Sequence, residues 1–390
     1  MIFLLFIISP FVACIAYTMS IWKMKTLSSK HIWTQAILLS LYMGVLGCTK
    51  ELRGDFLDYH EYFLYVPKCG FVDYLLSFGK EPLYYAYTYV SYYLFGGNWN
   101  LFVVSFTSIN YLLLSYAVIT ISKKINANIR TVITALYITM FFFQEFAASG
   151  NIVRQCLAQS LTVVFFVCYY IENKKKMWWI ALCAVCVHSS CIPIIGLGLI
   201  PMIKEKFTIK SMTKILLILS ICITVFYAAG DALSDIPFIG YIFSRATNSE
   251  QLLGQDSWQE EVGLRPIMLI LLLMLSYMAI SVYRTVNKGK ITKEIIAMVN
   301  FNIILILSMF ICNAIGAYYL LMRYFFFVYA FQCALITIYL SNTKSIQNNV
   351  IRPILIITII CYFFYNFTHN IFAYTSVGEA IFYPAPLHVF

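Results

Sequence analysis

The sequence predicts an all-α polytopic integral membrane protein, because of its composition and its long apolar runs. Of the 390 residues, 61% are hydrophobic and only 11% are charged, whereas a soluble domain carries roughly 25% charged residues. The apolar runs are long and continuous, while transmembrane strands would need short alternating segments. We therefore expect one transmembrane domain over residues 1–390 with about 10–12 helices, including broken or re-entrant segments.

Ten apolar runs are candidates to cross the membrane, whose hydrocarbon core is roughly 30 Å thick. They lie at residues 2–21, 31–48, 99–121, 131–147, 156–171, 214–229, 266–283, 295–315, 324–340 and 353–372.

Two further segments are irregular. Leu83–Phe95 is apolar and rich in tyrosine, but it is too short to span and ends at Gly96-Gly97. We expect a partial or surface-lying helix there that lines an outer cavity. Met177–Ile203 has lysines on both sides and is interrupted by His188-Ser189-Ser190. We expect two short helices lining the site, because broken backbone at membrane depth is tolerated only inside protein or beside a water-filled cavity.

Lysine-rich loops set the expected orientation, because cytoplasmic loops carry an excess of Lys and Arg. Such loops lie at Lys23–Lys30, Lys123–Lys124, Lys174–Lys176 and Arg284–Lys293. Both termini are then expected on the outer, periplasmic side, together with two larger loops at residues 49–82 and 230–265. The formal net charge of +10 reflects these basic loops, so we expect no nucleic-acid partner.

Arginines on the outer side are the first candidate site residues, because the orientation rule predicts few of them there. They are Arg53, Arg154, Arg245, Arg265 and Arg323. A guanidinium pairs with a carboxylate or a phosphate through two parallel hydrogen bonds. Each arginine could simply anchor a helix end or pair with a neighbouring acid, but Arg154 and Arg323 have no acidic residue close in sequence. A diphosphate at the membrane surface would satisfy them.

Three residues are candidates for a general base, namely Asp55, Glu81 and His188. Such a base must reach the proton that it removes, and burial and neighbours tune its pKa. Each acid could equally be a solvated loop residue or a helix N-terminal charge, and His188 a buried structural histidine. The sequence carries no metal-ligand motif and no phosphate-cradling glycine loop, so we expect no metal and no other cofactor.

Several short motifs, in this order and spacing over most of the chain, resemble the EpsG family. They are Arg53-Gly54-Asp55 with Tyr59, Glu81-Pro82-Leu83, Ile152-Val153-Arg154-Gln155 before a span, His188-Ser189-Ser190, and Arg323-Tyr324-Phe325. Tyr59, Gln155 and Tyr324 join the expected substrate-binding residues through this resemblance.

The resemblance implies a metal-independent glycosyltransferase, a Wzy-type polymerase of surface polysaccharide such as O-antigen, at the outer face of the bacterial inner membrane. Such an enzyme moves the growing glycan from undecaprenyl diphosphate onto an undecaprenyl-diphosphate-linked repeat unit. Both glycolipids are expected partners within the membrane lipid, and a chain-length regulator protein is a further candidate. Arg53, Arg154, Arg265 and Arg323 would hold the diphosphate, while Asp55, Glu81 or His188 would take the acceptor proton.

Other functions stay open. A flippase or exporter of lipid-linked oligosaccharide should carry polar residues through the depth of its spans, whereas these spans are largely apolar at their centres. A membrane acyltransferase acting on surface glycan would need a histidine near an outer arginine or glutamate, which His60 and His188 allow. A ligase that transfers finished glycan to another lipid shares the polymerase chemistry.

Overall fold

The protein is described from a computed structural model. The described residues are 2–24, 28–78, 81–205, 207, 209–228, 293–314, 318–341, 345–369 and 374–390. Every regular element among them is a helix, so the predicted all-α membrane class is confirmed. The expected second outer loop, 230–265, lies outside this part of the chain. The fold divides into two compact units, one of residues 1–196 with 332–390 and one of residues 197–331. The expectation of a single domain stays a prediction.

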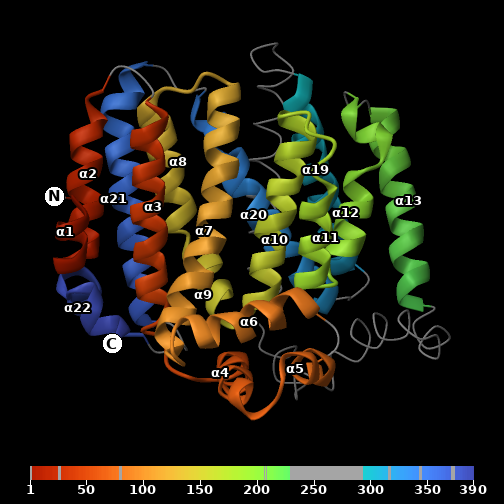
Figure 1. The fold of residues 1–390 in the computed structure, drawn as a ribbon. Coiled ribbons are helices and arrows are strands. Elements are labelled where there is room, and N and C mark those ends of the chain that lie inside the picture. The colour runs from red at the N-terminus through yellow and green to blue at the C-terminus, as the bar shows by residue number, and fades with distance from the viewer. Residues whose placement is uncertain are drawn as a thin grey trace. The chain divides into compact units, whose positions relative to one another are not determined.

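From α6 to α12 the helices follow each other with short connections (Figure 1). The amino-terminal part contains α1 (Ile2–Ile8), α2 (Pro10–Trp22), α3 (Ser29–Gly47), α4 (Asp55–Tyr65), α5 (Phe71–Phe78), α6 (Pro82–Leu94), α7 (Trp99–Lys124), α8 (Ile129–Met140), α9 (Phe143–Asn151), α10 (Val153–Phe166), α11 (Trp178–Val187) and α12 (Cys191–Gly198). The remainder contains α13 (Ile209–Ala228), α19 (Lys293–Ala314), α20 (Tyr318–Ser341), α21 (Ser345–His369), α22 (Val377–Phe382) and α23 (Ala385–Val389).

Four helical segments in the described part of the chain are long and apolar enough to cross a membrane. They are Trp99–Lys124, Glu294–Cys312, Tyr324–Ser341 and Val350–His369. The helices α8 and α9, bent by 45° at a short break, make a fifth if they form one span. At 1.5 Å per residue, the 26 residues of α7 rise about 39 Å, more than the roughly 30 Å hydrocarbon core.

The central helices of the first unit pack closely because small residues face each other. A Cβ atom built on Gly44 of α3 would lie 2.6 Å from the Val104 carbonyl oxygen of α7 and would also overlap the Ser108 side chain. One turn further, a Cβ on Gly47 would lie 3.1 Å from the Thr107 hydroxyl oxygen. Small residues allow such close backbone approach in membrane helices, where lipid offers no hydrophobic drive to association.

Basic side chains cluster at one end of this unit. Arg130 donates through Nε to the Trp22 carbonyl, 3.3 Å, and Lys123 donates to the Ser29 hydroxyl, 3.1 Å. Arg352 donates to the Asn128 amide oxygen of the same end, 2.9 Å. The acidic helices α4 and α5, the helix α6 and the carboxyl-terminal α22 lie at the opposite end of α7 (Figure 1). This separation matches the charge asymmetry from which we predicted the loops.

The irregular segments that the sequence indicated are present. The helix α6 has 13 residues and lies crosswise below the long helices in Figure 1. The helix α11 ends where His188 adopts an extended conformation, and α12 starts at Cys191. Two expected continuous spans are instead broken. Residues 2–21 divide at the extended Ser9 because Pro10 begins a new helix, and residues 131–147 divide between α8 and α9.

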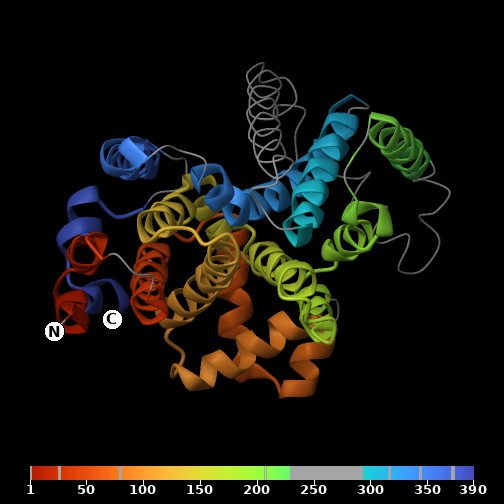
Figure 2. The same ribbon diagram turned by 90° about the horizontal axis from the view of Figure 1, so that it is seen from above.

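The second unit is a small helical assembly around α19. The side-chain amide of Asn300 donates to the carbonyls of Ile203 and Glu205, at 2.8 and 2.7 Å, and so ties α19 to the chain that follows α12. Phe301 of α19 packs edge to face on Phe331 of α20, with 4.9 Å between ring centroids. The amino and carboxyl ends of the whole chain belong to the first unit, where α22 and α23 pack on α2 and α1 (Figure 2).

Candidate functional site

The site begins with an ion pair between Arg154 and Glu81, which are far apart in the sequence. Glu81 is the residue before α6, and Arg154 lies in the first turn of α10. Arg154 donates through one terminal nitrogen, Nη1, to Glu81 and to the Tyr85 hydroxyl, the latter at 3.1 Å. The Glu81 side chain is only 6% exposed and that of Arg154 is 26% exposed. The fold thus supplies the acidic partner that Arg154 lacks among its sequence neighbours.

Three tyrosine rings surround the Arg154 guanidinium. Its central carbon lies 5.4 Å from the ring centroid of Tyr59 and 5.9 Å from those of Tyr84 and Tyr85. Tyr85 follows Glu81 by four residues, so both lie on one face of α6. A guanidinium within about 6 Å of aromatic faces is stabilised by the ring quadrupoles, and more strongly where water is excluded. The rings therefore stabilise the positive charge of this arginine in its position.

His188 completes the cluster from a third segment. Its Nε2 lies 3.5 Å from Glu81 Oε1, and its Nδ1 accepts a hydrogen bond from the Ser190 backbone N–H at 3.1 Å. A ring nitrogen that accepts a hydrogen bond carries no proton, so the neutral ring holds its proton on Nε2, facing Glu81. The break between α11 and α12 therefore positions a histidine against the same carboxylate that binds Arg154.

Of the other expected residues of the first outer loop, Arg53 and Asp55 are exposed, whereas Tyr59 belongs to the cluster. Arg53 pairs with Glu51 at 3.0 Å, and both side chains are largely exposed. Asp55 is exposed in the first turn of α4, after Gly54 turns the chain with a φ of 53°. Tyr59, one turn further along α4, is buried and reaches Arg154.

The remaining expected residues are distributed through the chain. Gln155 is buried within the first unit beside Arg154 in sequence. Tyr324 is buried in α20 of the second unit, next to Arg323, whose side chain lies outside the described part. Arg265 also lies outside it. The substrate-binding roles of these residues stay predictions.

Lys50 is a member of the neighbourhood that the sequence did not indicate. It follows α3, is only 5% exposed, and donates to the Gly150 carbonyl at 2.8 Å and to the Asn151 side chain. Its ammonium also lies 4.7 Å from the Phe56 ring centroid. Burial lowers the pKa of Lys50 to about 7, partly opposed by the nearby Asp55 carboxylate. Lys50 therefore stabilises the end of α9, three residues before Arg154. No local sequence signal indicates this role of Lys50.

Glu145 is a second residue that the sequence reasoning missed. It lies in the first turn of α9 and is fully buried, and the Asn110 side chain is the polar group that interacts with its carboxyl group. The sequence did offer one signal, a single acidic residue inside an otherwise apolar span. Ionisable residues within spans cost free energy and are usually functional.

Comparison with known proteins identifies the family of this chain. A family model described as the EpsG family matches residues 31–377. Neither a curated protein nor a solved structure matches the chain. The matched range contains the motifs around Arg53, Glu81, Arg154, His188 and Arg323, and it covers most of the sequence. The chain belongs to the EpsG family.

Proposed function

We propose that this protein is a polysaccharide polymerase, a glycosyltransferase that joins lipid-linked repeat units at the outer face of the bacterial inner membrane. Membership in the EpsG family supports a polymerase-like role in polysaccharide biosynthesis at a membrane. The observation that carries the finer proposal is the cluster of Arg154, Glu81 and His188. It brings a fixed cation, a buried carboxylate and an imidazole together at the end of the first unit that holds the acidic helices.

The proposed reaction breaks one bond and forms another. The acceptor hydroxyl attacks the anomeric carbon of the growing glycan, the bond from that carbon to the diphosphate oxygen breaks, and undecaprenyl diphosphate leaves. Arg154 stabilises the negative charge that develops on the leaving diphosphate. Its contacts to Glu81 and Tyr85 both use Nη1, and a quarter of its side chain is exposed. An arginine carries five N–H donors, so one that is already held in place can still meet a phosphate.

Glu81 is the base that the geometry favours for the acceptor proton. Its carboxylate is buried, whereas Asp55 is exposed. The neutral His188 presents a proton to Glu81, so we assign it to orienting that carboxylate. The donor is already activated as a diphosphate ester, so the proposed reaction uses no nucleotide sugar and no metal. Arg53, Arg265 and Arg323 remain proposed second contacts to the diphosphates, with Tyr59, Gln155 and Tyr324 as proposed contacts to the substrates.

The proposal is tested by the surface polysaccharide of cells that lack this protein. On a gel, the normal ladder should collapse to single repeat units on their acceptor, and the wild-type gene should restore the ladder. Loss of the single-unit band as well would point to a flippase or an earlier step and would contradict the proposal. An intact polymer that accumulates on its lipid without reaching its final acceptor would identify a ligase instead.

A further inference from the structure

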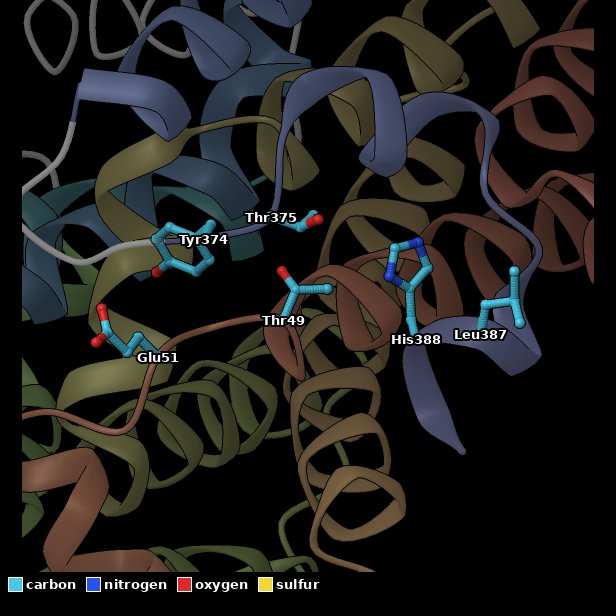
Figure 3. A pocket seen from close by; sticks show the side chains of 6 residues that line it. All are labelled: Thr49, Glu51, Tyr374, Thr375, Leu387 and His388. Atoms are coloured by element: carbon cyan, nitrogen blue, oxygen red, sulfur yellow. The ribbon is translucent and has the colours of Figure 1, made fainter.

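A pocket of about 520 Å³ opens beside the first outer loop and contains none of the three residues of the proposed catalytic cluster. Its wall comes from the chain after α3 and from the carboxyl-terminal segment. The lining residues are Thr49, Glu51, Tyr374, Thr375, Leu387 and His388. Figure 3 shows Tyr374 and Glu51 on one side and His388 with Leu387 on the other. The pocket is largely open to solvent.

The wall of this pocket is preformed, because the carboxyl-terminal segment is tied to the bundle. A capping box starts α22, in which Ser376 and Glu379 exchange side-chain-to-backbone hydrogen bonds. The Asn100 amide donates to the carbonyls of His388 and Val389, each at 3.4 Å, and the Tyr42 hydroxyl donates to the Ala380 carbonyl at 3.2 Å. A ligand would therefore find its partners in place and lose less free energy to ordering the protein.

The polar groups around the pocket suit a ligand with many hydroxyls. The His388 Nε2 faces the Glu379 carbonyl at 3.3 Å and must donate to it, which leaves Nδ1 of the neutral ring as an acceptor. Burial lowers the pKa of His388 below its ordinary value, in keeping with a neutral ring. Glu51 supplies acceptor oxygens, although Arg53 already neutralises its charge. These groups accept hydrogen bonds without presenting a net positive charge to an anion.

Tyr374 contributes an apolar surface. Its ring packs on Phe367 and Phe146, with centroid distances of 4.6 and 5.4 Å. Its hydroxyl is buried, with no hydrogen-bond partner in the described part of the chain. This hydroxyl has almost no exposed area, so the ring, and not the hydroxyl, is the part of Tyr374 that lines the pocket. Leu387, which is 68% exposed, adds an apolar surface on the other side.

We infer that this pocket is a glycan subsite, which holds sugars of the substrate beyond the reacting unit. This inference rests on the proposed polymerase function for its physiological ligand. Lys50 links the pocket to the segment that carries Arg154, because it lies between the lining residues Thr49 and Glu51 and binds the end of α9, three residues before Arg154. Phe146, which supports Tyr374, belongs to the same helix α9. A glycan held here would stay close to the cluster between successive additions.

The test measures binding of a lipid-free glycan to the purified full chain in detergent. The probe is the surface polysaccharide of wild-type cells, released from its lipid by mild acid, with dextran as the unrelated glycan. Leu387→Trp would fill the pocket and should weaken binding about tenfold, equivalent to about 1.4 kcal/mol. Glu51→Gln should also weaken glycan binding. The matched control is Leu76→Trp, at an α5 leucine that is 74% exposed and does not line the pocket.

Equal affinity of the wild type and of the correctly folded Leu387→Trp and Glu51→Gln variants would overturn the subsite, as would absence of glycan binding by the wild type. In cells, Leu387→Trp at normal protein level should shift the ladder towards shorter chains, whereas Leu76→Trp should leave it unchanged. The two proposals can fail separately. Deletion of the gene tests whether the protein joins repeat units. The binding assay tests whether the pocket is a glycan subsite, and its result does not depend on the band pattern of the deletion.

Discussion

At the scale of single residues, the chemistry of Arg154 depends on shape as well as charge. Its planar group meets Glu81 and Tyr85 while three tyrosine rings surround it. A lysine is a compact point charge that lacks this planar group and its contact with the three rings. The site therefore requires an arginine, whichever sugar is transferred.

Arg154→Lys should lower polymer formation by on the order of 10²–10³-fold, the usual cost of losing one stabilising donor in a transition state. Keeping the positive charge avoids leaving the buried Glu81 without a cation, which would cost stability as well. The measurement is polymer yield at equal protein level in the membrane. Arg53→Lys is the comparison, because Arg53 is exposed and pairs only with Glu51 among the described acids. Normal yield in Arg154→Lys would contradict the role of the planar guanidinium.

Glu81→Gln should remove the proposed base and reduce the rate by on the order of 10²–10⁴-fold, the range for general base catalysis. The amide is nearly the same size, so the fold should persist. Asp55→Asn, at the exposed start of α4, should have a much smaller effect. Initial rates with lipid-linked repeat units would separate the two variants. If Asp55→Asn were the inactive one, the base assignment would move to α4.

We expect Lys50 to make the stability of the folded protein depend on pH. Burial lowers its pKa from 10.5 to about 7 in the folded chain. Between pH 7 and 10.5 the unfolded chain therefore binds more protons, so the stability contributed by this residue rises with pH across that window. The test compares the thermal unfolding temperatures of the wild type and of Lys50→Met in detergent. The unfolding temperature of the wild type should rise relative to that of the variant between pH 7 and 9. The exposed Lys68→Met variant should show no such trend. A pH-independent difference for Lys50→Met would rule out this titration.

At the scale of elements, two kinds of helix contact build the first unit. The pair α3 and α7 relies on close backbone approach, whereas the cluster relies on helix ends and breaks. Glu81 precedes α6, Arg154 starts α10 and His188 ends α11. Residues at such ends can project polar groups without interrupting an apolar helix face, and backbone groups there are free to orient side chains.

Gly44→Ala should destabilise the protein by about 1–3 kcal/mol, the usual cost of overpacking. The added Cβ would lie 2.6 Å from the Val104 carbonyl oxygen, a backbone atom that can yield only if α3 and α7 separate. Gly378→Ala in α22 is the matched control, because the same addition there meets no atom within 4 Å. Thermal unfolding of both variants in detergent gives the comparison. Equal unfolding temperatures would mean that the helices separate at little cost.

At the scale of the whole molecule, the charge asymmetry is the feature that orients the chain. Basic side chains gather where α7 ends, while the acidic helices, the candidate cluster and the pocket gather near its start. Such an arrangement suits chemistry at one membrane face. The chain crosses the membrane several times, and which face meets the periplasm is a prediction from the lysines.

Cysteine labelling from outside the cell tests that orientation. In a Cys69→Ser background, Leu76→Cys should react with a membrane-impermeant maleimide, because Leu76 is exposed on α5. Lys175→Cys is also exposed in the fold but lies at the basic end, so it should react only after the cells are opened. Labelling of Lys175→Cys in intact cells would invert the proposed topology and remove the cluster from the outer face.

The sequence by itself determined the helical membrane class, the short helix α6, the break at His188 and the family motifs. These are local properties, because hydropathy, helix length and turn residues act over a few neighbouring positions. Tertiary structure alone decided that Glu81 is the partner of Arg154, that His188 faces the same carboxylate, and that Lys50 is buried against the end of α9. Charges pair across space, and the pairing depends on which helix ends the packing brings together. A sequence pattern without that packing leaves several equivalent partners open.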